Sequence, residues 1–443
     1  MPSPGPAPRG EMNSQNGLMI AGLSSGSGKT LISLGLMRAL KKRGVDIRGA
    51  KAGPDYIDPG FHRVALGRDS VNLDPFAMAP PLLSALAAGQ GGEFLMIEGV
   101  MGIHDGGNAS SAALARALGV PIVLVMDISG QAETAAAVAA GIRDSLKPMG
   151  VALAGVIFNR CRSPRHRDMA ASALLETGMA LFGAVMEDKG MSVPSRHLGL
   201  VQAEDLNGAE TIIRTAAEVM ADQVDLDRII AAGRPLRRDA ENGGNPGIAI
   251  PPPGQRIAVA RDRAFGFAYP HLLAGWQRAG AEVTPFSPLA DETLPMGSDF
   301  VFLPGGYPEL HLPELAAAKG FMESLRKAAR KNIPIYGECG GYMVLGRSII
   351  DADGTAVPMA GLLDCETSFA RRRLSLGYRR LERLGGIPLP SHATAHEFHY
   401  TTAISEKGAP AFAARDRDNN DLGTMGLQKG SVFGSYAHLI AAP

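Results

Sequence analysis

The sequence predicts an α/β protein built from two domains. Its 443 residues are too many for one ordinary hydrophobic core, and two domains of roughly 200 residues each are the expected division. Short apolar segments alternate with amphipathic helical segments in both halves, which is typical of parallel sheets covered by helices. Between the halves, residues 233–255 are rich in Gly, Pro, Asn and charge. We therefore expect a tail at 1–16, a first domain at 17–232, a linker at 233–255 and a second domain at 256–443.

The composition indicates a globular protein without affinity for nucleic acid or an anionic membrane. The formal net charge is zero, with 20% charged and 45% hydrophobic residues, so no excess of charge would attract a polyanion. Residues 1–16 are rich in Pro, Ser and Gly and lack an apolar signal segment, so we expect a disordered tail. The chain has no run of 18 apolar residues, which predicts no membrane span. Cys161, Cys339 and Cys365 are too far apart in sequence for a disulfide framework or a metal site, which favours a reducing compartment and hence the cytoplasm.

The first strand, loop and helix carry a phosphate-binding sequence. An apolar strand at 18–21 leads into residues 22–30, GLSSGSGKT, and then into an amphipathic helix that ends at about Arg43. Glycines let backbone N–H groups face an anion, the lysine reaches the outer phosphates, and the threonine hydroxyl can hold magnesium. The residues expected to bind ATP here are Gly26, Ser27, Gly28, Lys29 and Thr30.

The loop departs from the strict phosphate-loop pattern at one position. That pattern requires glycine at position 23, whereas this chain has Leu23 and places Gly22 one residue earlier. The spacing resembles that of the dethiobiotin-synthetase group. The resemblance predicts a P-loop NTPase-like parallel-sheet domain for the first half.

Carboxylates follow the next two predicted strands. Residues 51–60, KAGPDYIDPG, end a strand in a turn that carries Asp55 and Asp58, and Glu98 lies at the C-terminal end of the apolar strand at 94–98. Ligands of open parallel sheets lie beyond these strand ends, and magnesium prefers hard oxygen ligands that it shares with phosphates. Asp55, Glu98 and Thr30 are therefore the candidate metal ligands. The alternative for each acid, including Asp105 further along, is that it caps a loop.

The rest of the first half continues the alternation. We expect strands at 121–127, 151–158 and 181–186 and helices at about 131–146 and 164–176. Asn159, just past a strand end, is either a residue that reads the edge of the nucleobase or an ordinary turn residue. The polar loop at 194–200 either contacts an acidic substrate through Arg196 or is a solvated turn.

The second half carries a candidate nucleophile, Cys339. We expect strands at 256–260, 281–285, 299–303 and 334–337, the last of which runs into Gly337-Glu338-Cys339-Gly340-Gly341 and a helix. A free thiol has a pKa of about 8.5, so a nucleophilic cysteine needs a helix N-terminus or a histidine, and His438 near the C-terminus is the candidate. The alternative is a buried structural cysteine.

The turn at 304–310 contains Gly305 and Gly306, whose N–H groups are suited to an oxyanion hole. An ordinary hairpin turn is the alternative interpretation for the glycine pair.

The motifs, taken together, resemble those of the cobyrinate and hydrogenobyrinate a,c-diamide synthases of cobalamin biosynthesis over about residues 17–440. The family-like strings are KAGPDYIDPGFH, EGVMGIHDG, PSRHLGL, FSPLADE, GGYPEL, GECGGYM, HEFHY and SYAHL. The resemblance implies a synthetase domain followed by a class I-type glutamine amidotransferase domain. It also implies a glutamine-hydrolysing carbon–nitrogen ligase that uses ATP, Mg²⁺ and ammonia from L-glutamine to convert two carboxylates of a corrinoid into carboxamides.

The resemblance also implies roles for single residues. Cys339 corresponds to the nucleophile and His438 to the residue that activates it, while Tyr56, Asp58 and Asp105 correspond to positions that contact the carboxylate substrate. Two residues after the histidine stands Ile440, where the wider amidotransferase pattern has a glutamate, so the third member of the Cys–His site is unassigned.

The proposed chemistry needs both halves. A carboxylate does not condense with ammonia, because hydroxide is a poor leaving group, so ATP must first form an acyl phosphate. Ammonia must then reach this intermediate without becoming ammonium, which predicts a buried path between the domains.

Two other functions remain as alternatives. One is a related amidoligase that acts on cobyrate-type side chains, nickel sirohydrochlorin or a cell-wall lipid. The other is a nucleotide switch of the partition-ATPase type, but its signature lysine would stand at position 24, where this chain has Ser24. A homodimer is one option for the oligomeric state.

Overall fold

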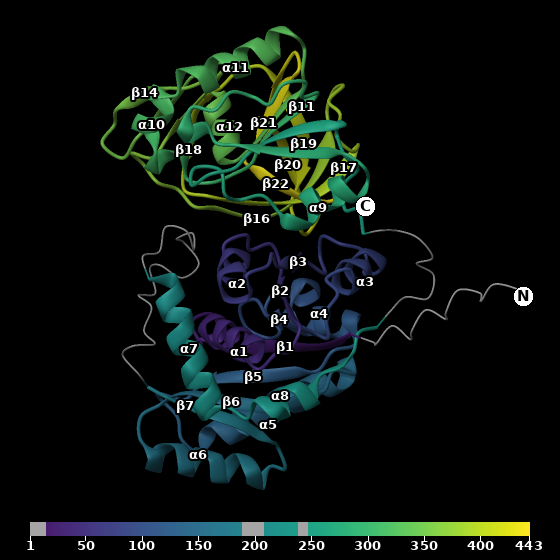
Figure 1. The fold of residues 1–443 in the computed structure, drawn as a ribbon, viewed down its shortest axis with the longest axis vertical. Coiled ribbons are helices and arrows are strands. Elements are labelled where there is room, and N and C mark those ends of the chain that lie inside the picture. The colour runs from purple at the N-terminus through teal and green to yellow at the C-terminus, as the bar shows by residue number, and fades with distance from the viewer. Residues whose placement is uncertain (1–14, 188–207, 238–246) are drawn as a thin grey trace, which may run out of the picture.

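The computed structural model of the protein describes residues 15–187, 208–237 and 247–443. Two α/β domains lie one above the other, with the first in purple to teal and the second in green to yellow (Figure 1). Three predicted segments fall at least partly outside the described residues: the tail up to residue 14, the loop at 194–200 and the linker at 238–246. Among the described helices, none has both the length and the apolar character needed to span a bilayer.

The first domain is a sheet whose central strands are buried along almost their whole length. The strand order is β3-β2-β4-β1-β5-β6-β7 with every neighbouring pair parallel, and β8 pairs antiparallel with β1. Continuous burial of β1, β4 and β5 requires cover on both faces of the sheet, as in doubly wound folds. The strands are β1 (Asn16–Gly22), β2 (Ile47–Ala52), β3 (Val71–Leu73), β4 (Phe94–Glu98), β5 (Ile122–Asp127), β6 (Leu153–Cys161), β7 (Leu181–Met186) and β8 (Arg234–Pro235). The helices are α1 (Lys29–Lys42), α2 (Asp58–Leu66), α3 (Pro80–Ala88), α4 (Ser111–Leu118), α5 (Thr134–Leu146), α6 (Pro164–Glu176), α7 (Ala209–Gln223) and α8 (Leu226–Ala232).

The predicted α/β class of the first domain is confirmed, and several elements lie within a few residues of their expected places. Helix α6 and strand β7 have the expected bounds, because Ser163 caps the helix and Pro164 stands at its first position. Parallel strands end at a shared edge, so the loops after β1, β2 and β4 meet there. This edge faces the second domain through α2, β3 and α3 (Figure 1).

The second domain is built on a sheet with a parallel half and an antiparallel half. The order is β10-β9-β11-β12-β21-β20-β19-β16-β17-β22, parallel from β10 to β21 and antiparallel beyond it, and β14-β13-β15-β18 form a smaller sheet. The parallel strands in the first part of this domain lie where the sequence predicted strands. The antiparallel strands after residue 345 were not predicted. The strands are β9 (Arg256–Ala260), β10 (Glu282–Phe286), β11 (Phe300–Leu303), β12 (Ile335–Glu338), β13 (Ser348–Ile350), β14 (Ala356–Pro358), β15 (Cys365–Ser368), β16 (Ser375–Arg383), β17 (His392–His399), β18 (Thr402–Glu406), β19 (Ala409–Arg415), β20 (Asp421–Lys429), β21 (Val432–Ser435) and β22 (Ala437–Ala441). The helices are α9 (Pro270–Arg278), α10 (Leu312–Ala317), α11 (Lys319–Arg330) and α12 (Gly340–Leu345).

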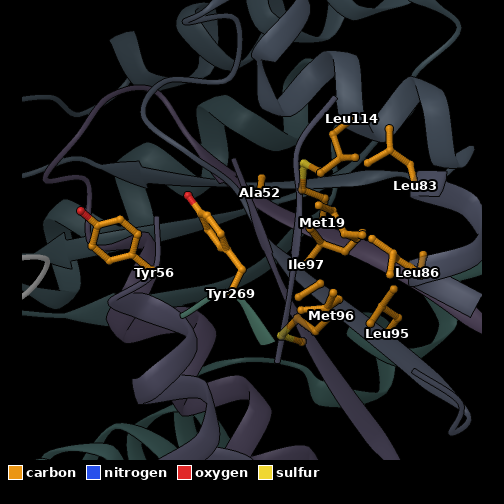
Figure 2. Close-up of a cluster of buried hydrophobic side chains, with 14 of the residues drawn as sticks. Met19, Ala52, Tyr56, Leu83, Leu86, Leu95, Met96, Ile97, Leu114 and Tyr269 are labelled. Atoms are coloured by element: carbon orange, nitrogen blue, oxygen red, sulfur yellow. The ribbon is translucent and has the colours of Figure 1, made fainter. Parts of the chain in front are cut away.

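The domains are joined by hydrogen bonds and by a continuous apolar core. The Tyr269 hydroxyl donates to the Pro54 carbonyl (2.8 Å), and the Tyr378 hydroxyl donates to Asp74 Oδ2 (2.8 Å). Buried apolar residues of both domains form one cluster. Figure 2 shows Tyr269 of the second domain beside Tyr56 of the first, close to Ala52 at the end of β2. The carboxyl edge of the first sheet is therefore covered by the second domain.

Candidate active site

The glycines of the phosphate-binding loop are required by its shape. Gly26 and Gly28 have φ angles of 79° and 90°, in the left-handed region that favours glycine. A Cβ atom on Gly28 would stand 2.1 Å from Asn159 Nδ2, and one on Gly22 would stand 2.3 Å from Ser27 Oγ. The displaced glycine at position 22 thus makes room for a serine hydroxyl of the loop itself.

Lys29 and Ser27 are buried within this loop, and Lys29 makes no salt bridge with any residue that the structure describes. Lys29 Nζ donates to the Ser24 carbonyl (2.8 Å), and burial together with the charge of Lys51 lowers the pKa of Lys29 to about 8. Ser27 Oγ is buried and has no hydrogen-bond partner within the described chain. Both groups can therefore turn to a phosphate without first breaking a salt bridge.

Glu98 is the centre of a buried charged network at the end of β4. Its Oε1 atom accepts from Thr30 Oγ1 (2.5 Å) and Lys51 Nζ (3.0 Å), and its Oε2 atom lies 2.7 Å from His62 Nε2. Burial alone would raise the pKa of Glu98, but Lys51 and His62 hold it well below the usual range. A fixed carboxylate thus lies beside the threonine of the phosphate loop.

Lys51 and His62 were not singled out from the sequence. Lys51 Nζ also pairs with Asp58 Oδ2 (2.6 Å), while His62 Nδ1 lies 2.9 Å from Ser70 Oγ. Two signals could have identified them: a lysine close to the end of buried strand β2, and a histidine four residues after Asp58, on the same face of α2. Their joint contact with Glu98 depends on how β2, α2 and β4 pack.

Asp55 and Asp58 have different surroundings although they are three residues apart. Asp55 Oδ1 accepts the N–H groups of Ile57 (2.8 Å) and Asp58 (3.2 Å), so it caps the start of α2. Burial and the nearby Asp55 raise the pKa of Asp58 against the opposing effect of Lys51. Lys51 therefore pairs with two carboxyl groups of different character. Glu98 is firmly ionised, whereas Asp58 is more easily protonated.

Asp105 and Asn159 both lie near the phosphate loop. Asp105 is exposed, its Oδ2 atom accepts the Gly102 N–H (2.8 Å), and its charge acts on Lys29. Asn159 was predicted just past a strand end, but β6 continues to Cys161, so Asn159 lies within the strand. It is buried, and its amide donates to the Ser27 carbonyl (3.0 Å). Asn159 thus supports the loop directly in this structure.

The oxygen atoms at this edge suit a magnesium ion bound together with a nucleotide. The Thr30 hydroxyl and the Glu98 carboxylate are in contact, Asp55 lies on the neighbouring loop, and the Ser27 hydroxyl is unpaired among the described residues. Hydroxyl and carboxylate oxygens are the hard ligands that magnesium takes alongside phosphate oxygens. Thr30, Asp55 and Glu98 therefore offer oxygen atoms of the kind that the ion binds, although the described residues contain no cluster of three or more acidic, histidine or cysteine side chains arranged around one point.

In the second domain, Cys339 stands on a strained turn between β12 and α12. Its φ and ψ angles are 46° and −105°, a conformation that costs roughly 1–3 kcal/mol for a residue with a side chain. A Cβ atom on Gly341 would come within 2.0 Å of the Leu303 carbonyl, so glycine is obligatory there. The Cys339 N–H donates to the Ser435 carbonyl (2.8 Å), which ties the turn to the segment that carries His438.

Cys339 and His438, the candidate nucleophile and base, both have surroundings that favour their neutral forms. Burial, assisted by the charge of Glu309, raises the pKa of Cys339 well above its usual range. Burial, assisted by His396, lowers the pKa of His438 to about 3. Cys339 is therefore a thiol and His438 a neutral imidazole in these surroundings, and a thiolate would form only on proton transfer from the thiol.

The glycine pair of the 304–310 turn is also set by packing. A Cβ atom on Gly305 would stand 2.2 Å from His438 Cε1, and one on Gly306 would stand 2.0 Å from the Ala264 carbonyl. The Gly306 nitrogen lies 3.0 Å from the point where a Cβ atom on Gly340 would be. The turn thus lies against both the histidine and the residue that follows the cysteine.

Tyr56 connects the two sites. Its ring centroid lies 4.6 Å from that of His438 and 4.5 Å from that of Phe267. Its hydroxyl lies 3.4 Å from the Phe398 carbonyl, and the same carbonyl lies 4.0 Å from Cys339 Sγ. The loop that carries Asp55 and Asp58 therefore contacts the histidine of the other domain, a contact that the sequence did not predict.

A cavity of about 740 Å³ opens beside this junction. Tyr56 and Arg63 line it from the first domain, and Arg261, Phe265 and Phe267 line it from the second. The cavity is formed only when the two domains are docked.

Comparisons with known proteins assign both halves of the chain. Residues 18–201 match the CobQ/CobB/MinD/ParA nucleotide binding domain, and residues 256–443 match the CobB/CobQ-like glutamine amidotransferase domain. The first match implies a nucleotide site on the P-loop NTPase-like domain. The second confirms the glutamine amidotransferase-like class predicted for the C-terminal half.

Whole-length relatives carry one common name. The chain is 50% identical to a hydrogenobyrinate a,c-diamide synthase of Brucella abortus, over 96% of this chain and 98% of that protein. It is 48% identical to the protein of that name from Rhizobium meliloti (96% and 99% covered) and 46% identical to the one from Rhodobacter capsulatus (96% and 98% covered). The chain therefore belongs to the hydrogenobyrinate a,c-diamide synthase family.

Proposed function

We propose that this protein uses ATP and glutamine to convert the a and c carboxylates of hydrogenobyrinate into carboxamides in cobalamin biosynthesis. It is a glutamine-hydrolysing carbon–nitrogen ligase. The observation that carries the proposal is identity of about half of the residues over nearly the full length of proteins with that name. The presence of both a phosphate loop and a Cys–His site, joined by Tyr56, supports it.

The first domain would activate the carboxylate. Lys29 and the backbone of the phosphate loop would hold the phosphates of ATP in line with the substrate carboxylate, so that an acyl phosphate forms. Magnesium would neutralise charge on the transferred phosphate when bound, and Thr30, Asp55 and Glu98 are the residues that would hold it. Lys51 would keep Glu98 ionised and oriented throughout.

The acidic and aromatic residues around this edge would receive the corrinoid. Asp58 lies beside Lys51 at the start of α2, and Asp105 lies beside the phosphate loop. We propose that Tyr56, Asp58 and Asp105 contact the carboxylate substrate, and that Asn159, besides bracing the loop, faces the nucleobase.

The second domain would release ammonia from glutamine. Cys339 Sγ attacks the carboxamide carbon while His438 accepts the thiol proton, and His438 then returns the proton to the departing ammonia. The N–H groups of Gly305 and Gly306 would stabilise the negative oxygen of the tetrahedral intermediate. Water then hydrolyses the thioester, and the enzyme is restored as glutamate leaves.

Ammonia would pass to the acyl phosphate through the buried junction at Tyr56. The Tyr56 side chain extends from the Asp55–Asp58 loop to the ring of His438, so it borders both sites. A buried path keeps ammonia unprotonated and hence nucleophilic. A cytoplasmic location and a homodimeric assembly stay predictions from the sequence.

The proposal is tested by incubating the purified protein with ATP, Mg²⁺ and glutamine and following the product masses. Hydrogenobyrinate, cobyrinate, an a,c-diamide corrinoid and nickel sirohydrochlorin are offered separately. We expect two successive amidations of hydrogenobyrinate. Turnover of only the a,c-diamide or the nickel compound would replace this function by that of a related amidoligase.

A further inference from the structure

A buried carboxylate faces the histidine of the glutamine site. Glu338 Oε2 lies 3.7 Å from His438 Nδ1, and the two side chains are 2% and 0% exposed. Glu338 is the last residue of β12 and immediately precedes Cys339. The carboxylate therefore comes from the strand that presents the nucleophile, and not from the strand that carries the histidine.

The usual place for a histidine-orienting acid is closed in this fold. Ile440, two residues after His438, is fully buried, and its carbonyl lies 2.8 Å from His271 Nε2. An acid at position 440 would have to replace an apolar side chain in the core. The structure thus offers a carboxylate from a different direction.

Glu338 is held in a defined orientation. Its Oε1 atom accepts the backbone N–H of Leu439, the residue directly after His438, at 2.9 Å. This bond leaves Oε2 directed toward the imidazole. Within the described residues, neither ring nitrogen of His438 makes a hydrogen bond of standard geometry, although the Phe267 backbone lies near enough to act on its pKa. Nδ1 can therefore pair with the carboxylate, and this pairing leaves Nε2 as the nitrogen that could accept a proton.

The chemistry of the site requires such a partner. For Nε2 to accept the proton of Cys339, the hydrogen of the neutral ring must be on Nδ1. A carboxylate opposite Nδ1 favours that tautomer and stabilises the imidazolium that forms when the proton arrives. A separation of 3.7 Å is a loose contact that a small movement of either side chain closes, as is common in sites without substrate.

We propose that Glu338 is the positioning residue of the glutamine-hydrolysing site and that it fixes the tautomer and orientation of His438. This inference rests on the proposed function, because it assigns a third member to the Cys–His pair of the same reaction. Glu338 acts on the reacting atoms only through His438.

The state of Glu338 depends on the groups around it. Tyr336 faces it from the same strand, Tyr269 from the start of α9, His438 from β22 and Cys339 from the following turn. Burial raises the pKa of Glu338 to about 8. A protonated Glu338 would donate to Nδ1 and impose the wrong tautomer, so glutamine hydrolysis should fall as the pH drops through this value.

The decisive variant is Glu338→Gln in the full-length enzyme. Glutamine keeps the size of the side chain and the acceptor for Leu439, but it turns an N–H donor toward Nδ1. We expect kcat for glutamine hydrolysis to fall about 10²- to 10⁴-fold, with KM for glutamine unchanged and the acidic limb of the pH profile lost. Glu338→Asp, which keeps the charge, should recover part of the rate.

Three further measurements separate positioning from structural damage. Amidation with ammonium salt should be unaffected in Glu338→Gln, because the synthetase site is intact. Glu366→Gln, which makes the same chemical change at a half-buried acid bonded to Ser348, should hydrolyse glutamine normally. In the His438→Ala background, Glu338→Gln should cause no additional loss.

Wild-type glutamine hydrolysis in Glu338→Gln, or a loss that adds to that of His438→Ala, would overturn the inference. A wild-type enzyme that hydrolyses glutamine but never amidates hydrogenobyrinate would instead count against the proposed function. The two failures are therefore distinguishable.

Discussion

The two buried sites differ in how their charges are compensated. At the first site the Glu98 carboxylate contacts Thr30, Lys51 and His62. At the second site the pKa of Cys339 is raised and that of His438 is lowered, so both groups are neutral. The first site thus holds an ionised carboxylate with its partners, whereas at the second site Cys339 and His438 would become charged only when the thiol proton moves.

The difference corresponds to the substrates proposed for each site. Phosphates and carboxylates arrive charged, so the groups that receive them must be ionised and fixed beforehand to avoid reorganisation. The carboxamide of glutamine is neutral, so a buried Cys–His pair need not be charged before glutamine binds. Burial therefore accompanies ionised, paired side chains at the first site and neutral side chains at the second.

The largest expected effect separates the two sites completely. Cys339→Ala should abolish amidation with glutamine but leave amidation with ammonium salt, because the acyl phosphate forms in the other domain. The measurement is amide formation with each nitrogen donor. Cys365→Ala, which removes another buried thiol of the same domain, should keep both activities. Loss of the ammonium-dependent reaction in folded Cys339→Ala would mean that the sites are not separable.

The charged network of the first site is tested by Glu98→Gln. Neutralising the carboxylate leaves Lys51 and His62 without a shared anion, so we expect amidation with either nitrogen donor to fall at least about 10²-fold. Breaking a buried ion pair should also lower the free energy of unfolding by about 3 kcal/mol. Steady-state rates and urea denaturation measure the two effects. Normal amidation by this variant would remove Glu98 from the nucleotide site.

The junction between the sites is tested by Tyr56→Ala. Removing the ring opens the space between His438 and the Asp55–Asp58 loop, so glutamine should be hydrolysed without a matching yield of amide. We expect the ratio of glutamate to amide formed to rise by about tenfold, an order of magnitude typical of lost positioning. Tyr56→Phe is the matched control, since the hydroxyl contact with Phe398 is long at 3.4 Å. An unchanged ratio in the alanine variant would show that ammonia takes another route.

The last test concerns stability, and it uses Lys29, the cation of the phosphate loop. The pKa of Lys29 is about 8 in the folded protein and 10.5 ordinarily, so the unfolded chain binds the proton more tightly. The charged lysine therefore opposes folding in full below pH 8, and this penalty fades as the pH rises from about 8 to 10.5. Lys29→Met should be inactive. At pH 7 its free energy of unfolding should be higher than that of the wild type by up to about 3 kcal/mol, which raises the melting temperature by a few degrees. The gain should be smaller at pH 9.5. A lower melting temperature at pH 7 would contradict the lowered pKa.

Much of the candidate site was predictable because its signals are local. The phosphate loop, Cys339 and the strand-end acids stand in short segments whose glycines and apolar neighbours dictate one backbone shape. Gly26 and Gly28, for example, have positive φ angles, which disfavour a side chain through the local backbone alone. The same locality explains why α6 and β7 were predicted with their observed bounds.

The sequence alone determined the two α/β domains, the succession of their main parallel strands along the chain and the pair of chemistries, since each depends on residues close together in the chain. Only the tertiary structure brought Lys51 and His62 to Glu98, Tyr56 to His438, and Glu338 to the imidazole. These contacts join residues from different strands, helices or domains, and no local pattern encodes which of them will meet. They arise from strand order and from the docking of two domains, where burial removes water and makes each charge depend on its partners.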